Sequence, residues 1–291
     1  MPRSAILRTI LRLYAHELPL FWTGMLGIAL GLICIVGMAF HGVIVEPEGN
    51  LYKAASFDIA VGLYLLTLAL ITKIAAFTPQ GLRRFRRVLI GLALYGYAVE
   101  TIQIFRGFDP RFSKVSSPLD QAIGGIFFLS AIGILVCFLV LMLRFFFRPT
   151  AGEGGPLVLA LRYGTVASLL GFGVGITISA QGTAHVGATG NLLPLHAAGF
   201  HALQAIPLVA LLLAWARVPE GEARKAVHLA GVAWLAACLA IAWQTSTGRS
   251  VLEPSGPVFV ACALLLVWAL TLSKALLAFR RSGARLDFLA A

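Results

Sequence analysis

Eight apolar runs of about 20 residues constrain the fold of this chain more than any other feature of its sequence. A run of that length crosses the hydrocarbon core of a bilayer as an α-helix. Only 12% of the 291 residues are charged, against about 25% in an ordinary soluble domain. The sequence therefore predicts an all-α, polytopic transmembrane helical bundle of about eight spans, at residues 19–40, 56–77, 86–106, 121–147, 157–180, 193–216, 226–245 and 256–279.

No polar linker is long enough to separate a soluble module, so we predict a single transmembrane domain over residues 1–291. Short matches recur 141 residues apart: the tripeptide Gly-Asn-Leu occurs at 49–51 and again at 190–192, and Gln103 matches Gln244. These matches suggest a parallel repeat of four plus four spans, residues 1–148 and 149–291. Chance similarity between apolar sequences is the alternative.

The basic residues are distributed unevenly between the two sides of the predicted bundle. Of the 23 Lys and Arg residues, 18 fall on the side of the two termini and five on the other. Because cytoplasmic loops carry an excess of Lys and Arg, both termini are predicted to be cytoplasmic. The net charge of +11 therefore reflects orientation in a lipid bilayer, and we expect no nucleic acid partner. A homo-oligomer is also compatible with the sequence.

Polar groups inside the spans gather in the half that faces away from the cytoplasm. Glu100 stands out among them, because a carboxylate in a span costs about 2.5–3.5 kcal/mol at the helix centre and usually has a function. We predict that Glu100 is a ligand, a proton carrier or a general base, and it is the candidate catalytic residue. The alternative is a structural carboxylate paired with Arg106, with Arg249 or with a histidine.

A second group of polar residues lies in the stretch from residue 190 to residue 207, at the mouth of the sixth span. His196 and His201 are five positions apart, so a straight helix points them about 140° away from each other. Gln204 shares a face with His201, as Gln103 does with Glu100. These side chains are expected to contribute to one outward-facing polar site.

Our leading interpretation of this site is that it binds a metal ion or haem for redox chemistry, with a redox protein or a small molecule as its partner. Imidazole is a common ligand of zinc, copper and iron, including haem iron. The predicted metal ligands are His41, Glu100, His196 and His201, and the predicted cofactor-binding residues are His196, His201, Gln103 and Gln204.

Two other functions are compatible with the same residues. In a proton- or ion-coupled transporter of small molecules, Asp58 and Glu100 would bind protons or cations and Pro207 would act as a hinge. In a structural or assembly subunit, the polar groups would only hold helices together. No Walker A, H-E-x-x-H, G-x-S-x-G or C-x-x-C-H motif occurs, so the sequence indicates no class of enzyme.

Two segments resemble uncharacterised bacterial integral membrane proteins: HAAGFHALQAIPL, at residues 196–208, and YAVETIQIFRGFDPRF, at residues 97–112. The resemblance covers most of the spans and implies a location in the bacterial inner membrane. It implies no activity, cofactor or substrate.

Overall fold

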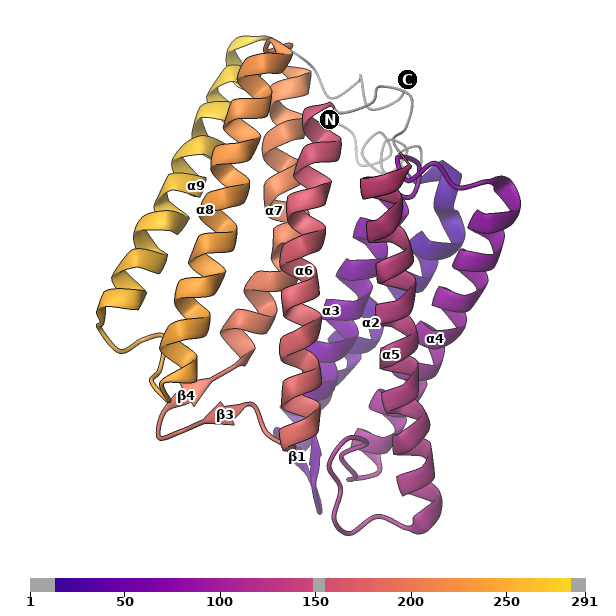
Figure 1. The fold of residues 1–291 in the computed structure, drawn as a ribbon. Helices are drawn as coiled ribbons and strands as arrows, with labels where there is room; N and C mark the ends of the chain where they lie inside the picture. The colour runs from indigo at the N-terminus through magenta and orange to yellow at the C-terminus, as the bar shows by residue number, and fades with distance from the viewer. Residues whose placement is uncertain (1–13, 149–154, 284–291) are drawn as a thin grey trace. The chain divides into compact units, whose positions relative to one another are not determined.

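The computed structural model describes residues 14–148 and 155–283, and within these residues the chain is a bundle of long helices (Figure 1). Eight helices in this part of the chain are long and apolar enough to cross a membrane, which confirms the predicted polytopic bundle. The helices are η1 (Ala15–Glu17, a 3₁₀ turn), α2 (Leu18–His41), α3 (Leu51–Ile71), α4 (Pro79–Phe105), α5 (Pro118–Phe147), α6 (Pro156–Gln181), α7 (Leu193–Trp215), α8 (Glu220–Ser246) and α9 (Gly256–Arg281). Two hairpins are formed by β1 (Ile44–Val45) with β2 (Gly49–Asn50) and by β3 (His185–Val186) with β4 (Gly190–Asn191).

Helix α3 begins at Leu51, five residues before the predicted start at residue 56. The side-chain oxygen of Asn50 accepts a hydrogen bond from the backbone N–H of Lys53, which caps the helix. Hydropathy missed this start because the first turn contains a charged residue. Asp58, the third residue of the predicted span 56–77, is therefore about two turns inside the helix, and it is fully buried.

The chain divides into two compact units, of which unit 1 ends at Leu143 and unit 2 begins at Arg144. In unit 1, α2 lies along α3, and both helices pack against α4. Helix α5 is joined to α4 by a hydrogen bond of 2.9 Å from the Tyr95 hydroxyl to the carbonyl oxygen of Ile123. In unit 2, α6 pairs with α7 and α8 pairs with α9, while α7 and α6 also contact α8.

Glycines allow the first two helices of each unit to approach closely. A Cβ atom on Gly24 of α2 would lie 2.9 Å from the carbonyl oxygen of Gly62 on α3. In unit 2, a Cβ atom on Gly199 of α7 would lie 2.7 Å from the Cα atom of Gly171 on α6. Close backbone packing of this kind drives helix association in a bilayer, where the hydrophobic effect between helices is weak.

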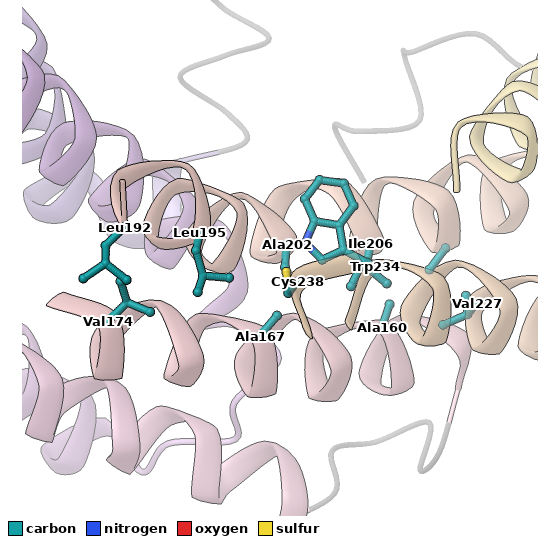
Figure 2. Packing of buried hydrophobic residues seen from close by; sticks show 11 residues of the cluster. Ala160, Ala167, Val174, Leu192, Leu195, Ala202, Ile206, Val227, Trp234 and Cys238 are labelled. Atoms are coloured by element: carbon teal, nitrogen blue, oxygen red, sulfur yellow. The ribbon is translucent and has the colours of Figure 1, made fainter. Parts of the chain in front are cut away.

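Among the described residues, the interior of unit 2 has an apolar core and buried polar side chains such as Ser168 and Gln244, but no buried charged side chain. Figure 2 shows its core, with Trp234 among small and aliphatic side chains of α6, α7 and α8. The indole N–H of Trp234 donates a 2.9 Å hydrogen bond to the carbonyl oxygen of Ala198, which satisfies its polar atom. Within the described residues, the buried charged side chains all belong to unit 1; they are Glu17, Asp58, Glu100, Asp109 and Asp120.

The two units repeat one local structure at a spacing of 141 residues. The paired residues are Ile44–Asn50 and Val45–Gly49 in the first hairpin, and His185–Asn191 and Val186–Gly190 in the second. The carbonyl of Gly107, with φ of 86°, accepts a 2.8 Å hydrogen bond from the N–H of Glu48. Its counterpart Gly248, with φ of 75°, accepts one of 3.0 Å from the N–H of Thr189. Each hairpin is thus joined to a glycine turn that follows the third helix of its unit.

A buried ion pair joins the start of α2 to α4. Both carboxylate oxygens of Glu17 accept hydrogen bonds from the guanidinium of Arg86, at 2.8 and 2.9 Å. The Glu17 side chain has no exposure, whereas that of Arg86 is 25% exposed. The bidentate geometry satisfies the carboxylate, so this pair fixes the first helix of unit 1 to the third.

We predict that Arg86→Ala destabilises the protein, because it leaves the Glu17 carboxylate buried without a partner. Breaking a buried pair in this way costs about 3–5 kcal/mol, and the partial exposure of Arg86 places the effect toward the lower end. Thermal unfolding in detergent measures the loss. The matched control is Arg87→Ala, which removes the exposed neighbouring arginine and should leave stability nearly unchanged; equal effects of the two substitutions would contradict the prediction.

Candidate functional site

Two carboxylates, Asp58 and Glu100, lie inside unit 1 near its hairpin end, the end that carries β1–β2 and the loop 106–117. Asp58 is seven residues from the start of α3, and Glu100 is five residues from the end of α4. At 1.5 Å per residue these positions are about 10 and 8 Å from the helix ends. Both side chains have 0% exposure. Two ionisable groups are therefore enclosed within the part of unit 1 that crosses the membrane.

Arg111, in the loop 106–117, reaches back into the bundle and forms an ion pair with Glu100. Its guanidinium also lies over two aromatic rings, 5.5 Å from the centroid of Phe57 on α3 and 5.7 Å from that of Phe127 on α5. Contacts at this distance are favourable cation–π interactions. One side chain from a loop thus links α3, α4 and α5 above the buried carboxylate.

Asp58 is close to this pair but is only half satisfied by hydrogen bonds. Its Oδ2 accepts a 2.9 Å hydrogen bond from the hydroxyl of Thr101, one residue after Glu100 on α4. Asp58 also interacts electrostatically with Glu100 and Arg111. Among the residues that the structure describes, neither Asp58 Oδ1 nor Glu100 Oε2 has a hydrogen-bond partner.

Tyr97 of α4 adds a buried hydroxyl group to the polar residues around Asp58. Its hydroxyl is buried, lies over Gly27 of α2, and has no hydrogen-bond partner in the described part of the chain. Tyr97 interacts electrostatically with Asp58. We refer to Asp58, Tyr97, Glu100, Thr101 and Arg111 as the Asp58–Glu100 cluster. Buried polar atoms are normally paired, so three unpaired oxygens in one cluster indicate a site that can accept a proton or a ligand.

A second ion pair holds the loop above the cluster. The Nζ atom of Lys53, in the first turn of α3, lies 2.8 Å from Oδ2 of Asp109. The backbone N–H of Arg111 donates a 2.9 Å hydrogen bond to Oδ1 of Asp109. Burial acts to raise the pKa of the Asp109 carboxyl, but these hydrogen bonds and the two positive charges outweigh it. The pKa of Asp109 is therefore lower than its ordinary value.

The base of the loop is fixed by a third network. Arg106 donates to Gln103 and to Asp120, both at 2.6 Å, and Gln103 donates to Asp120 at 2.9 Å. The hydroxyl of Ser117 donates to the other oxygen of Asp120 at 2.7 Å. Gln103, a predicted cofactor-binding residue, has its side-chain amide engaged in hydrogen bonds that close the loop against α5.

The histidines predicted to bind a metal lie apart from this cluster in the sequence, and they have different surroundings. His41 is exposed at the end of α2. His196, in unit 2, is half-buried; its Nδ1 lies 2.8 Å from the carbonyl oxygen of Gly171 and its ring packs edge-on against Phe200. His201 is exposed on α7, and Gln204, one turn further along the helix, is half-buried. His196 is half-buried and His201 is exposed, which agrees with the prediction that the two side chains point in different directions.

The predicted metal site gains no support from the structure. Over residues 14–148 and 155–283, no group of three or more His, Cys, Asp or Glu side chains is arranged to hold a metal ion. Of the predicted ligands, Glu100 lies in unit 1 and is paired with Arg111, whereas His196 and His201 belong to unit 2. The carbonyl contact of His196 satisfies its Nδ1 within unit 2.

Comparison of the chain with family models, with curated proteins and with solved structures finds no match. The geometry of the Asp58–Glu100 cluster is therefore the basis on which a function can be proposed.

Sequence reasoning identified Glu100 but not its partner. The predicted partners of a structural Glu100 are Arg106, Arg249 or a histidine, and the structure pairs Glu100 with Arg111, eleven positions along the chain in the segment RGFDPRF. In the same segment, Asp109 accepts a hydrogen bond from the backbone N–H of Arg111 and forms an ion pair with Lys53 of α3. One feature of the sequence does point to this pairing: the charged residues of RGFDPRF come directly after a span that contains a carboxylate. Such a loop can fold back onto the span and bring a cation to the carboxylate.

We predict that Asp109→Asn destabilises the protein at neutral pH by an amount near the lower end of about 1.5–3 kcal/mol, the range for hydrogen bonds to charged groups, because its partner Lys53 is half-exposed. A carboxyl with a lowered folded-state pKa contributes stability above its unfolded pKa of about 4 and loses that contribution as the pH falls through the folded value. The unfolding midpoints of the wild-type protein and the variant should therefore differ at pH 7 and converge below about pH 4.

The control for this measurement is Glu222→Gln, which alters an exposed carboxylate at the start of α8. This substitution should leave the midpoint close to that of the wild-type protein throughout the range. A difference between the wild-type protein and Asp109→Asn that persists unchanged in acid would show that Asp109 does not act through its charge.

Proposed function

We propose that this chain is a proton-coupled transporter of a small molecule and that Asp58 and Glu100 are its proton-binding residues. The observation that carries the proposal is the presence of two fully buried carboxylates beside one guanidinium, each with an oxygen that has no hydrogen-bond partner in the described part of the chain. Ionisable residues in this situation inside membrane spans are typical of proton relays in pumps and transporters.

The charges of the cluster do not balance if both carboxylates are ionised. Arg111 is paired with Glu100, and the neighbouring cation, Lys53, is engaged by Asp109. An ionised carboxylate without a partner is so costly in a low-dielectric interior that it takes up a proton instead. In the proposed resting state Asp58 therefore holds a proton while Glu100 is ionised. If the ion pair between Arg111 and Glu100 breaks, the protonation of the two carboxylates changes.

A comparison with unit 2 argues that these charges are not needed to form the fold. At the spacing of 141 residues, the counterparts of Asp58, Glu100 and Arg111 are Gly199, Ile241 and Leu252. Unit 2 nevertheless forms the same hairpin and the same glycine turn. We infer that the two units arose by duplication, as parallel repeats do in other transporters, and that the charges of unit 1 serve function.

The other functions suggested by the sequence have less support. A metal site with three or more protein ligands requires side chains that converge, and the described residues contain no group of three or more His, Cys, Asp or Glu of that kind. A role as structural glue would lead us to expect carboxylates as fully satisfied as Glu17, whose two oxygens both accept hydrogen bonds. Nothing observed favours a catalytic role for Glu100 over proton binding.

We predict that the detergent-solubilised protein at neutral pH shows the infrared carbonyl stretch of a protonated carboxylic acid, and that Asp58→Asn removes it. The amide retains an oxygen that can accept the hydrogen bond from Thr101, so the variant should fold, which circular dichroism can verify. The matched control is Glu253→Gln, which changes a half-exposed carboxylate paired with Arg249 in unit 2 and should leave the band in place.

The absence of this band from the wild-type protein would overturn the proposal, because both carboxylates would then be ionised. A band that is unchanged in Asp58→Asn would also count against it, since the proton would belong to another residue.

A further inference from the structure

We propose that the transported molecule is a small monocarboxylate with an apolar body, which binds Arg111 in place of Glu100. The inference deepens the proposed function and rests on it, because it requires Glu100 to take up a proton when it is released. It is carried by the surroundings of Arg111, by the geometry of its ion pair and by the pairing of Lys53 and Arg106, the two cations whose ion pairs flank the cluster.

Arg111 is the group of the cluster that a solute arriving at the hairpin end meets first. Its side chain is 24% exposed, whereas that of Glu100, to which it is paired, is not exposed at all. The guanidinium lies against the rings of Phe57 and Phe127, whose centroids are 5.4 Å apart. A planar guanidinium beside two phenylalanines suits a ligand with one carboxylate and an apolar or aromatic body.

The Glu100–Arg111 pair is less complete than the other buried arginine pair of unit 1. In the Glu17–Arg86 pair both carboxylate oxygens accept hydrogen bonds. In the Glu100–Arg111 pair the arginine contacts Oε1, and Oε2 has no hydrogen-bond partner among the described side chains and backbone. Buried pairs offset their desolvation only when their geometry is good, so Glu100 is the carboxylate that an incoming ligand can displace.

The charge of the ligand follows from the other cations at the hairpin end. Lys53 is bound by Asp109, and Arg106 is bound by Asp120 and Gln103. Lys114, the remaining cation of the loop 106–117, has an exposed side chain. Of Lys53, Arg106 and Arg111, Arg111 alone has a partner with an unpaired oxygen. A dianion would require a second available cation, whereas a monocarboxylate replaces Glu100 with no change in the number of ion pairs.

The exchange conserves charge and forms no covalent bond. The ligand carboxylate takes the place of Glu100 on Arg111, and the freed Glu100 carboxylate takes a proton from water and becomes neutral. One negative charge and one positive charge enter the site together, so the step is electroneutral. By linkage, ligand binding strengthens proton binding at Glu100 and proton binding strengthens ligand binding by the same factor.

The test measures benzoate binding to the purified full-length protein in detergent by titration calorimetry. Titrations in two buffers of different ionisation enthalpy report the number of protons taken up with each benzoate. We expect binding with uptake of close to one proton, weaker binding of acetate because it has no ring to contact Phe57 and Phe127, and no binding of chloride at the same concentration.

Two substitutions separate the roles of the pair. Glu100→Gln removes the competitor for Arg111, so benzoate should bind more tightly, by about tenfold or more, without proton uptake. Arg111→Lys keeps the charge but loses the planar fork, so benzoate should bind about tenfold more weakly. The control Arg249→Gln, at the half-exposed pair of unit 2, should change neither quantity. Circular dichroism establishes that each variant is folded.

Three results would overturn the inference: no benzoate binding to the wild-type protein at millimolar concentration, benzoate binding without proton uptake, or loss of binding in folded Glu100→Gln. The infrared band of Asp58 is measured without any ligand, so it tests the proposed function independently. If that band is present and benzoate does not bind, the proton site stands and the monocarboxylate is excluded; if the band is absent, the proposed function fails first.

Discussion

The cost of burying carboxylates in an apolar interior is the constraint on which the rest of unit 1 depends. Asp58 and Glu100 cannot both be ionised there without partners, since an unpaired charge in a low-dielectric medium is strongly unfavourable. The loop 106–117 meets part of this cost because it folds back and brings Arg111 to Glu100. Lys53 and Asp109 hold the loop in that position. The hairpin end of unit 1 is therefore organised around two buried groups.

Unit 1 contains two kinds of buried carboxylate. Glu17 is bound on both oxygens by Arg86, which makes a closed, bidentate contact suited to holding helices together. Glu100 is paired on one oxygen, and within residues 14–148 and 155–283 the hydroxyl of Thr101 is the one hydrogen-bond partner of the Asp58 carboxylate. The contrast lies within one bundle, so it does not arise from a general shortage of hydrogen-bond donors. In the proposed mechanism the incomplete contacts are the ones that change during transport.

The two units differ in polarity although they share a local structure. The hairpins and the glycine turns at Gly107 and Gly248 recur at the same spacing, with equivalent hydrogen bonds. The buried carboxylates of the described chain are confined to unit 1, whereas unit 2 has an apolar core around Trp234. If the units arose by duplication, as we propose, unit 2 has kept the fold without buried charges among its described residues, and unit 1 has acquired buried carboxylates in the same fold.

Sequence alone determined the eight spans, because a run of apolar residues long enough to cross a bilayer is a local property that composition reveals. It also identified Glu100, since a carboxylate in such a run is anomalous wherever the helix lies. Tertiary structure alone decided that Arg111 pairs with Glu100, that Asp58 lies two turns inside α3, and that Gln103 binds Arg106 and Asp120. These facts depend on how a helix is capped, how it is rotated about its axis and how a loop folds back onto it. Hydropathy contains none of that information, because helices of equal hydropathy can present any face to their neighbours.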